Sequence, residues 1–169
     1  MKMTLTGMGA LASLLIGMIG TSGSALADTN TYAGALCEPL GTGQQFSRTI
    51  SFGMGNPNPF ASAIFVCPLV RDNLPAAFPF VSGAQVVVND FTTTGLVTCT
   101  LTSKSAGGGT LAAQARSTTS PGVGIQTLVF GALPTQSTGY LTLHCVLPPR
   151  ATAGGQGTSR VVSYRATEL

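Results

Sequence analysis

The chain has 169 residues, of which only 8% are charged, with 8 Lys and Arg against 5 Asp and Glu. The formal net charge of +3 is not clustered, so nucleic-acid binding is not expected, because neutralising phosphates needs a basic stripe. Because the chain has 22 glycines and many hydroxyl residues, its surface carries few charged side chains. Such a surface suits an exported protein that meets neutral polymers or copies of itself.

The first 27 residues have the pattern of a secretory signal peptide. Lys2 precedes an apolar stretch at 11–19, and small residues follow up to Ala27. The apolar stretch is shorter than the roughly 20 residues of a spanning helix, so we expect no membrane span in the mature chain. We expect cleavage after Ala27, a flexible lead-in or an edge segment at 28–36, and a single domain at 37–169. The expected location is secreted, either periplasmic or extracellular.

Strands are the elements that the periodicity predicts, because apolar and polar residues alternate along short stretches. The eight predicted strands are residues 45–52, 61–67, 84–91, 96–103, 110–116, 124–130, 140–147 and 159–167. After residue 27, proline or glycine interrupts every apolar run before three helical turns accumulate, so no long helix is expected. This spacing predicts an all-β, antiparallel, jelly-roll-like sandwich, with hairpins between the third, fourth and fifth strands.

Four cysteines lie beyond the expected cleavage point: Cys37, Cys67, Cys99 and Cys145. An even count in an exported chain predicts two disulfides, and the lack of a Cys-x-x-Cys knuckle argues against a zinc site. Cys99 and Cys145 lie on the apolar sides of their strands, whereas Cys37 and Cys67 each adjoin a proline-containing turn. Of the three pairings open to four cysteines, we therefore expect Cys37 with Cys67 and Cys99 with Cys145.

Several short motifs accompany these cysteines. They are Cys37-x-Pro39, CPLVRD at 67–72, CTL at 99–101, CVLPP at 145–149 and SYR at 163–165. This order resembles a group of small secreted bacterial proteins with a four-cysteine, CPLVRD-type pattern. The resemblance spans most of the mature chain and implies a bacterial source and two disulfides. It implies no activity, ligand or cofactor.

Catalytic sets are not apparent in the sequence. The sole histidine, His144, lies on the outward side of its strand, and no Gly-x-Ser-x-Gly elbow accompanies it. We therefore expect no enzyme of the Ser-His-Asp type, and we expect neither a cofactor nor a metal.

Four polar residues remain candidates for a ligand-binding site. Asp72 and Asn73 follow the second predicted strand, and Asn89 and Asp90 end the third. If these strands are neighbours, the four side chains converge at one end of the sandwich, where they could bind a glycan or a calcium ion. The two aspartates could also act as the acids of a small hydrolase. The alternative, which we favour, is that both aspartates accept backbone N–H bonds in turns.

These patterns together predict an exported, non-enzymatic protein that acts by binding or assembly at the cell envelope or outside the cell. Strand edges offer a route to self-association. The alternative is a carbohydrate-binding module, calcium-assisted or not, whose partner is a glycan or another cell-surface polymer. A small hydrolase is the third hypothesis.

Overall fold

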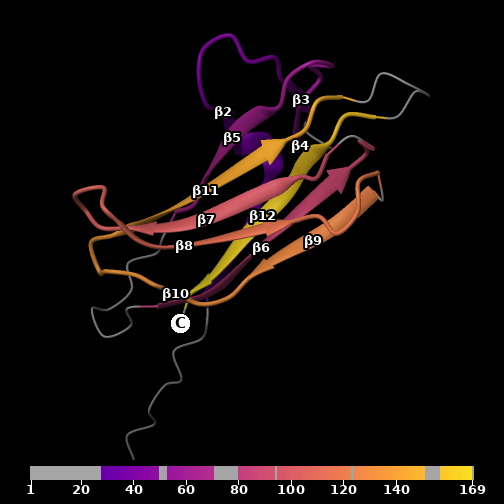
Figure 1. Cartoon of the computed structure of the whole chain (residues 1–169). Helices are drawn as coiled ribbons and strands as arrows, with labels where there is room; N and C mark the ends of the chain where they lie inside the picture. Colours follow the sequence, from indigo (N-terminus) through magenta and orange to yellow (C-terminus); the bar gives the residue numbers. More distant parts are fainter. Residues whose placement is uncertain are drawn as a thin grey trace, which may run out of the picture.

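A computed structural model describes residues 28–49, 53–70, 80–93, 95–122, 124–150 and 157–168. Within these ranges all strand pairings are antiparallel, and the strands form two sheets. Figure 1 shows the two sheets packed face to face as a sandwich. No helix in this part of the chain is long and apolar enough to cross a membrane.

We name the two sheets A and B. Sheet A contains β1 (Asp28–Ala33), β3 (Ser47–Thr49), β4 (Gly53–Gly55), β6 (Phe80–Asp90), β9 (Gly124–Phe130), β10 (Leu133–Pro134) and β12 (Arg160–Glu168). Sheet B contains β2 (Glu38–Pro39), β5 (Ala63–Pro68), β7 (Thr98–Lys104), β8 (Thr110–Ser117) and β11 (Tyr140–Leu147). A short 3-10 helix, η1 (Gly34–Leu36), follows β1.

The strand order is that of a jelly roll. The main strands of sheet A follow the order β4-β12-β6-β9, and those of sheet B follow β5-β11-β7-β8. Apart from the β7–β8 hairpin, each connection between successive main strands crosses from one sheet to the other. This interleaving is typical of two Greek keys in a double-sheet jelly roll, and it confirms the predicted fold class.

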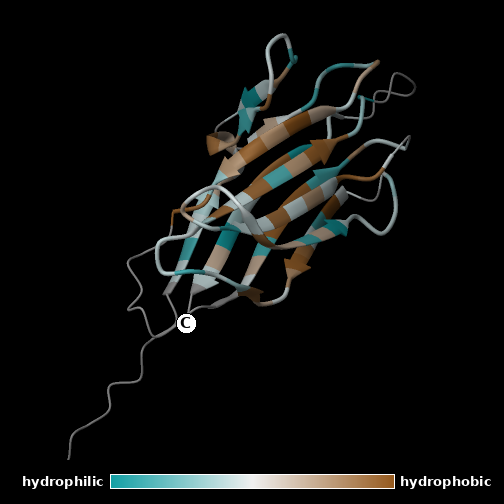
Figure 2. Ribbon diagram, turned by 60° about the vertical axis from the view of Figure 1, so that its left-hand side comes forward, coloured by the Kyte–Doolittle hydropathy of each residue, from teal (hydrophilic) through white to brown (hydrophobic). Residues whose placement is uncertain are grey.

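The core lies between the sheets because successive residues of each strand point to opposite faces. Along β6, Ala84, Val86 and Val88 are buried, while the residues between them are partly exposed. Figure 2 shows the same alternation of hydrophobic and hydrophilic positions along the strands. The largest fully buried side chains include Tyr164, Phe65, Phe130, Met54, Leu101 and Leu143.

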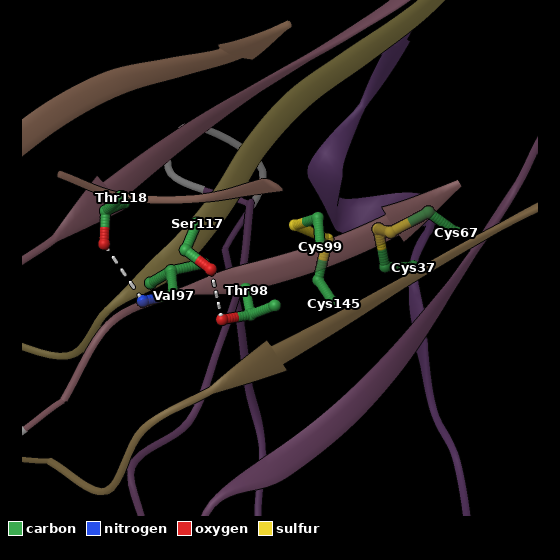
Figure 3. Close-up of a disulfide and its surroundings, with 8 residues drawn as sticks. All are labelled: Cys37, Cys67, Val97, Thr98, Cys99, Ser117, Thr118 and Cys145. Atoms are coloured by element: carbon green, nitrogen blue, oxygen red, sulfur yellow. Dashed lines mark hydrogen bonds between the residues drawn. A yellow bond between two sulfur atoms is a disulfide. The ribbon is translucent and has the colours of Figure 1, made fainter. Parts of the chain in front are cut away.

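Both predicted disulfides form, and both lie in sheet B (Figure 3). Cys99 on β7 is in direct register with Cys145 on β11, with their Cα atoms 4.0 Å apart. Cys37 precedes β2 and joins Cys67 on β5, also with a Cα separation of 4.0 Å. The first bridge fastens the start of β2 to β5, and the second fastens β7 to β11, the strand that pairs with β5. The disulfides indicate an oxidising, non-cytoplasmic environment.

The prediction of one strand at 45–52 is wrong. β3 ends at Thr49 and β4 begins at Gly53, and these two residues face each other in an antiparallel pair. Gly53 has a φ of 78°, a conformation that favours glycine. The alternation of apolar and polar residues runs through the reversal unchanged, so periodicity alone does not reveal it.

The predicted hairpin between the third and fourth strands is also wrong, because β6 and β7 lie in different sheets. Residues 91–97 span the roughly 10 Å between the layers, a distance that a loop of hairpin length covers easily. The hairpin between the fourth and fifth strands is confirmed, and its turn is closed by a 2.8 Å bond from Ser105 N to Gly109 O.

Residues 28–36 form β1 and η1, which lie beside β12 at the edge of sheet A. β1 pairs with β12 along its whole length, from Asp28 to Ala33. The ring of Tyr32 stacks on Tyr164 with centroids 5.3 Å apart. At Gly34 in η1, a Cβ atom would lie 2.0 Å from the carbonyl oxygen of Val161, so the segment packs closely against β12.

Candidate functional site

Asp90, one of the predicted ligand residues, is a fully buried carboxylate with 0% exposure. Its Oδ1 accepts bonds from the Ser159 hydroxyl at 3.0 Å and from the Thr92 amide and hydroxyl at 3.3 and 3.4 Å. Its Oδ2 accepts bonds from the Thr118 hydroxyl at 2.7 Å and the Val97 amide at 3.5 Å. Both oxygens are therefore occupied, and Asp90 has the turn-bracing role that we favoured over ligand binding.

Asn89, the one other predicted ligand residue that the structure describes, does not join Asp90. Asn89 precedes it on β6 and points to the opposite face of the sheet, away from the core. Asp72 and Asn73 lie outside the described residues. Among the residues that the structure covers, no group of three His, Cys, Asp or Glu side chains could hold a metal ion. His144 is half-buried on the outward side of β11, as expected.

A different surface, the outer face of sheet A, carries two adjacent hollows. The first, of about 230 Å³, is lined by Gly83, Ala84, Gln85, Val129, Phe130 and Thr167. The second, of about 260 Å³, is lined by Thr31, Gln85, Val87, Ser163, Tyr164 and Arg165. Sites for drug-sized ligands usually measure about 300–1,000 Å³, so each hollow suits one side chain or one sugar ring.

Gln85 lines both hollows, and Arg165 lines the second one. In the strand register, Gln85 on β6 faces Arg165 on β12, and Thr31 and Val129 extend this row across β1 and β9. The Arg165 Nη2 atom donates a 2.7 Å hydrogen bond to Gln85 Oε1. This bond holds the exposed guanidinium in place through an amide rather than a carboxylate. The cation therefore keeps its full charge and further N–H donors for a ligand.

Hydroxyl and aliphatic side chains surround this pair. Thr29 and Thr167 form a hydroxyl pair at 3.3 Å on one side, and Ser163 faces Val87 on the other. Two apolar side chains of β9 are well exposed on the same face, Val129 at 56% and Ile125 at 71%. This mixture of hydroxyls, an amide, one cation and aliphatic groups is suited to an uncharged partner or polymer.

Side chains of β8 cover part of the free edge of β9. Gln114 accepts a 2.9 Å bond from Gly131 N and donates a 3.2 Å bond to Ala132 O. Arg116 Nε donates a 3.0 Å bond to Val129 O. These bonds satisfy backbone groups that a second strand would otherwise use, so strand addition at this part of the β9 edge is blocked.

Sequence reasoning missed the outer face of sheet A because its polar residues come from distant segments. Gln85 and Arg165 are 80 residues apart in the chain and meet only through the β6–β12 pairing. The one available signal was the outward position of polar residues in the third and last predicted strands, at 84–91 and 159–167.

Comparison with known proteins gives no family. No protein-family model matches this sequence, and no curated protein sequence matches it. Solved structures to which the chain is similar in part include the following three.

The first is the structure of infectious bursal disease virus Gx strain, with a TM-score of 0.44, 13% identity and coverage of 85% of this chain and 32% of that chain. The second is Arthrobacter globiformis T6 isomalto-dextranase complexed with panose, with a TM-score of 0.41, 12% identity and coverage of 82% and 23%. The third is the enzymatically active domain of bacteriophage CBA120 tailspike protein 4, with a TM-score of 0.39, 11% identity and coverage of 85% and 18%. The chain spans less than a third of each of these chains, and likeness at this level carries no argument about function.

Proposed function

We propose that this chain is an exported, non-enzymatic protein that acts by binding or assembly outside the cytoplasm, with the outer face of sheet A as its binding surface. The observation that supports the proposal is the pair of hollows of about 230 and 260 Å³ that share Gln85, which accepts a hydrogen bond from Arg165 in the lining of the second hollow. The two disulfides support export, since such bonds persist in oxidising compartments.

The chemistry of the face suits recognition. Arg is enriched in protein interfaces, because its planar group can hydrogen-bond and stack at once. Exposed Val129 and Ile125 add apolar contact area at the β9 side of the same face. A partner would gain contact area from the aliphatic groups and orientation from the guanidinium and amide.

Carbohydrate binding is the second candidate. Thr31, Gln85 and Ser163 line the hollow of about 260 Å³, and their hydroxyl and amide groups both donate and accept hydrogen bonds. Sugar hydroxyls need partners of this kind. Calcium assistance through Asp90 has no support, because five hydrogen bonds already occupy its carboxylate.

Retention on insoluble polymers tests the proposal. Purified mature protein is incubated with cell-wall and polysaccharide preparations, with and without chelator, and the unbound fraction is sized by light scattering. The double variant Gln85→Ala/Arg165→Ala removes the polar pair, and Thr100→Ala on the outer side of sheet B is the matched control.

We expect the wild type to be retained on a glycan or to form high-mass particles. The double variant should weaken that behaviour roughly tenfold or more, as truncation of a central interface residue does. The control should behave as the wild type. Equal behaviour of all three proteins would exclude the outer face of sheet A as the binding surface.

A further inference from the structure

One row of residues across the outer face of sheet A carries three buried polar atoms without a hydrogen-bond partner in the described part of the chain. They are Ser47 Oγ on β3, Arg160 Nη1 on β12 and Asn89 Oδ1 on β6. In the strand register, Gly55 on β4 lies between Ser47 and Arg160. Arg160 in turn faces Asn89. Because buried polar atoms are nearly always hydrogen-bonded, three in one row indicate a partner from outside the chain.

This row is within reach of a group that docks on the sheet. Cross-strand partners in an antiparallel pair point to the same face. Ile125, which faces Asn89 and is 71% exposed, shows that this face is the outer one. Ser47, Arg160 and Asn89 are only half-buried as whole residues, although the three named atoms are fully buried. These atoms therefore lie just below the surface.

Gly55 positions the side chain of Arg160. A Cβ at Gly55 would lie 2.8 Å from Arg160 Cγ and 2.9 Å from Thr158 Cγ2. The stem of Arg160 thus leans over β4 at the one position of the row that has no side chain, on the side toward Ser47. This packing restrains the stem before a ligand binds, so little side-chain entropy is lost on binding.

No described carboxylate neutralises Arg160. The chain has five acidic residues: Asp28, Glu38, Asp72, Asp90 and Glu168. Asp90 is buried with Ser159 and its other donors, and Glu38 lies on β2 in sheet B. Asp28 faces Glu168 at the other end of β12, roughly 25 Å from Arg160 along the strand. Asp72 lies outside the described residues. A half-buried cation without a counter-ion is costly, so an anionic ligand would be stabilised here.

The three atoms differ in what they need. Arg160 Nη1 donates, and the Ser47 hydroxyl can donate beside it, which suits an oxyanion. Asn89 Oδ1 only accepts, so it needs a donor from the ligand. Neighbouring strands lie about 5 Å apart, and one small ligand can therefore contact both Arg160 and Asn89. A sulfate ion has no donor for Asn89, whereas a ring with a carboxylate and hydroxyls satisfies all three atoms.

We propose that this row binds an acidic sugar, with its carboxylate on Arg160 and Ser47 and a ring hydroxyl on Asn89. Binding of an acidic sugar rests on the proposed function of the outer face of sheet A and names the class of its polymer. The hollows suit uncharged units, so the polymer that fits both sites carries acidic sugars among neutral ones.

A β-bulge places the two sites on one face. The register shifts between Val161 and Ser163, where β12 has one residue more than β6. Without this extra residue, alternation would point Arg160 and Arg165, five positions apart, to opposite faces. With it, both arginines face outward at a distance of about 15 Å along the strand, which a chain of a few sugar units can span.

Titrations followed by NMR spectroscopy of the labelled mature protein test the ligand class. The probe is glucuronate, at constant ionic strength. Glucose lacks its carboxylate, acetate lacks its hydroxyls, and N-acetylglycine carries a carboxylate beside an amide N–H, as the end of a peptide does.

Three variants test the residues. Arg160→Gln removes the cation. Asn89→Asp places a carboxylate in the row, where it can pair with Arg160. Lys104→Gln is the control, since it removes a cation from β7 in sheet B. Circular dichroism and melting confirm that each variant is folded.

Glucuronate should bind the wild type and Lys104→Gln saturably and equally. Glucose, acetate and N-acetylglycine should bind about tenfold or more weakly, because each leaves one of the needed hydrogen bonds unmade. Arg160→Gln should weaken glucuronate binding about 10- to 100-fold, as the loss of a bond to a charged group does. Asn89→Asp should abolish this binding and raise the melting temperature, which excludes misfolding as the cause of the loss.

The absence of saturable binding of glucuronate to the wild type would overturn the acidic-sugar site, and so would equal binding by Arg160→Gln. Binding of N-acetylglycine as tight as that of glucuronate would also overturn it, in favour of a peptide carboxyl terminus.

Polymer retention separates the two proposals. If Gln85→Ala/Arg165→Ala loses retention while Arg160→Gln binds glucuronate like the wild type, the binding face stands and the acidic-sugar site falls. If glucuronate binding depends on Arg160 but the double variant is retained like the wild type, the acidic-sugar site stands and the proposed role of the hollows falls.

Discussion

The hydroxyl of Thr118 donates a 2.7 Å hydrogen bond to the buried carboxylate of Asp90, and it thereby joins the β8–β9 crossover to the end of β6. Ser159, just before β12, and Val97, just before β7, bond to the same carboxylate. Jelly-roll crossovers have no ladder partners of their own. One carboxyl group with several donors holds three of them together.

Replacing Asp90 should therefore destabilise the fold without affecting any ligand. Asp90→Asn keeps the shape but turns a donor group toward donors, and we expect a loss of about 2–3 kcal/mol in the free energy of unfolding. Urea unfolding measures it, with Thr93→Ala in the neighbouring exposed position as the control. Chelator should leave the wild-type curve unchanged. A loss no larger than that of the control would contradict the bracing role.

The Cys99–Cys145 bridge should contribute strongly to stability. It closes a sequence separation of 46 residues, for which the chain-entropy relation gives about 4 kcal/mol. A small domain is stable by only about 5–15 kcal/mol, so the Cys99→Ala/Cys145→Ala variant should unfold at much lower denaturant. Non-reducing peptide mapping of the wild type should recover this pair and Cys37–Cys67. Any other linked pair of peptides would show the pairing to be wrong.

Gly53 should not tolerate a side chain. A Cβ there would lie 1.8 Å from the carbonyl oxygen of Val161, and the residue has a φ of 78°. We expect Gly53→Ala to destabilise the protein by about 3 kcal/mol or more, because backbone must shift. Gly43→Ala separates the two causes, since Gly43 has a φ of 81° and nothing within 4 Å of a Cβ.

Gly107→Ala is the neutral control, because a Cβ at Gly107 meets open space and its φ is not positive. It should change the free energy of unfolding by about 0.5 kcal/mol or less. The melting temperature should be lowest for Gly53→Ala, intermediate for Gly43→Ala and highest for Gly107→Ala. A melting temperature of Gly53→Ala equal to that of Gly43→Ala would show that the contact with Val161 does not matter.

Tyr164 should make stability fall at alkaline pH. Burial, with a smaller contribution from the neighbouring phenol of Tyr32, raises the pKa of Tyr164 from 10.0 to about 12. Below pH 10 the phenol is neutral in both states, so its contribution to stability is complete. Between pH 10 and 12 the unfolded state loses the proton while the folded state keeps it, which destabilises the fold by roughly 2–3 kcal/mol.

Tyr164→Phe should remove this part of the pH dependence. Its stability near neutral pH should change little, because the buried Tyr164 hydroxyl has no hydrogen-bond partner among the described residues. The control is Tyr140→Phe, since Tyr140 is 42% exposed. Denaturant unfolding at pH 8, 10 and 11 should show a flatter profile for Tyr164→Phe alone. Identical profiles for both variants would contradict the role of burial.

Much of the architecture was predictable, because the alternation of apolar and polar residues along a strand shows which side of that strand is buried. Cys99 and Cys145 both fell on apolar faces, and this local fact was enough to pair them correctly. From its type and place, Asp90 was open both as a ligand residue and as a hydrogen-bonded turn residue, and only the structure gives the bonds that its carboxyl group accepts. The reversal between Thr49 and Gly53 was missed, because a tight reversal preserves the period of two.

The sequence by itself determined most of the long strands, the fold class and the disulfides, since each depends on which side of a strand faces the core. Only the tertiary structure decided which strands are neighbours. Alternation places Gln85 and Arg165 on outward faces, yet the long-range pairing of β6 with β12 brings them to 2.7 Å and forms the hollows beside them. The lengths of the loops did not predict that β6 pairs with β12, because a crossover between the sheets and a hairpin within one sheet need similar lengths of chain.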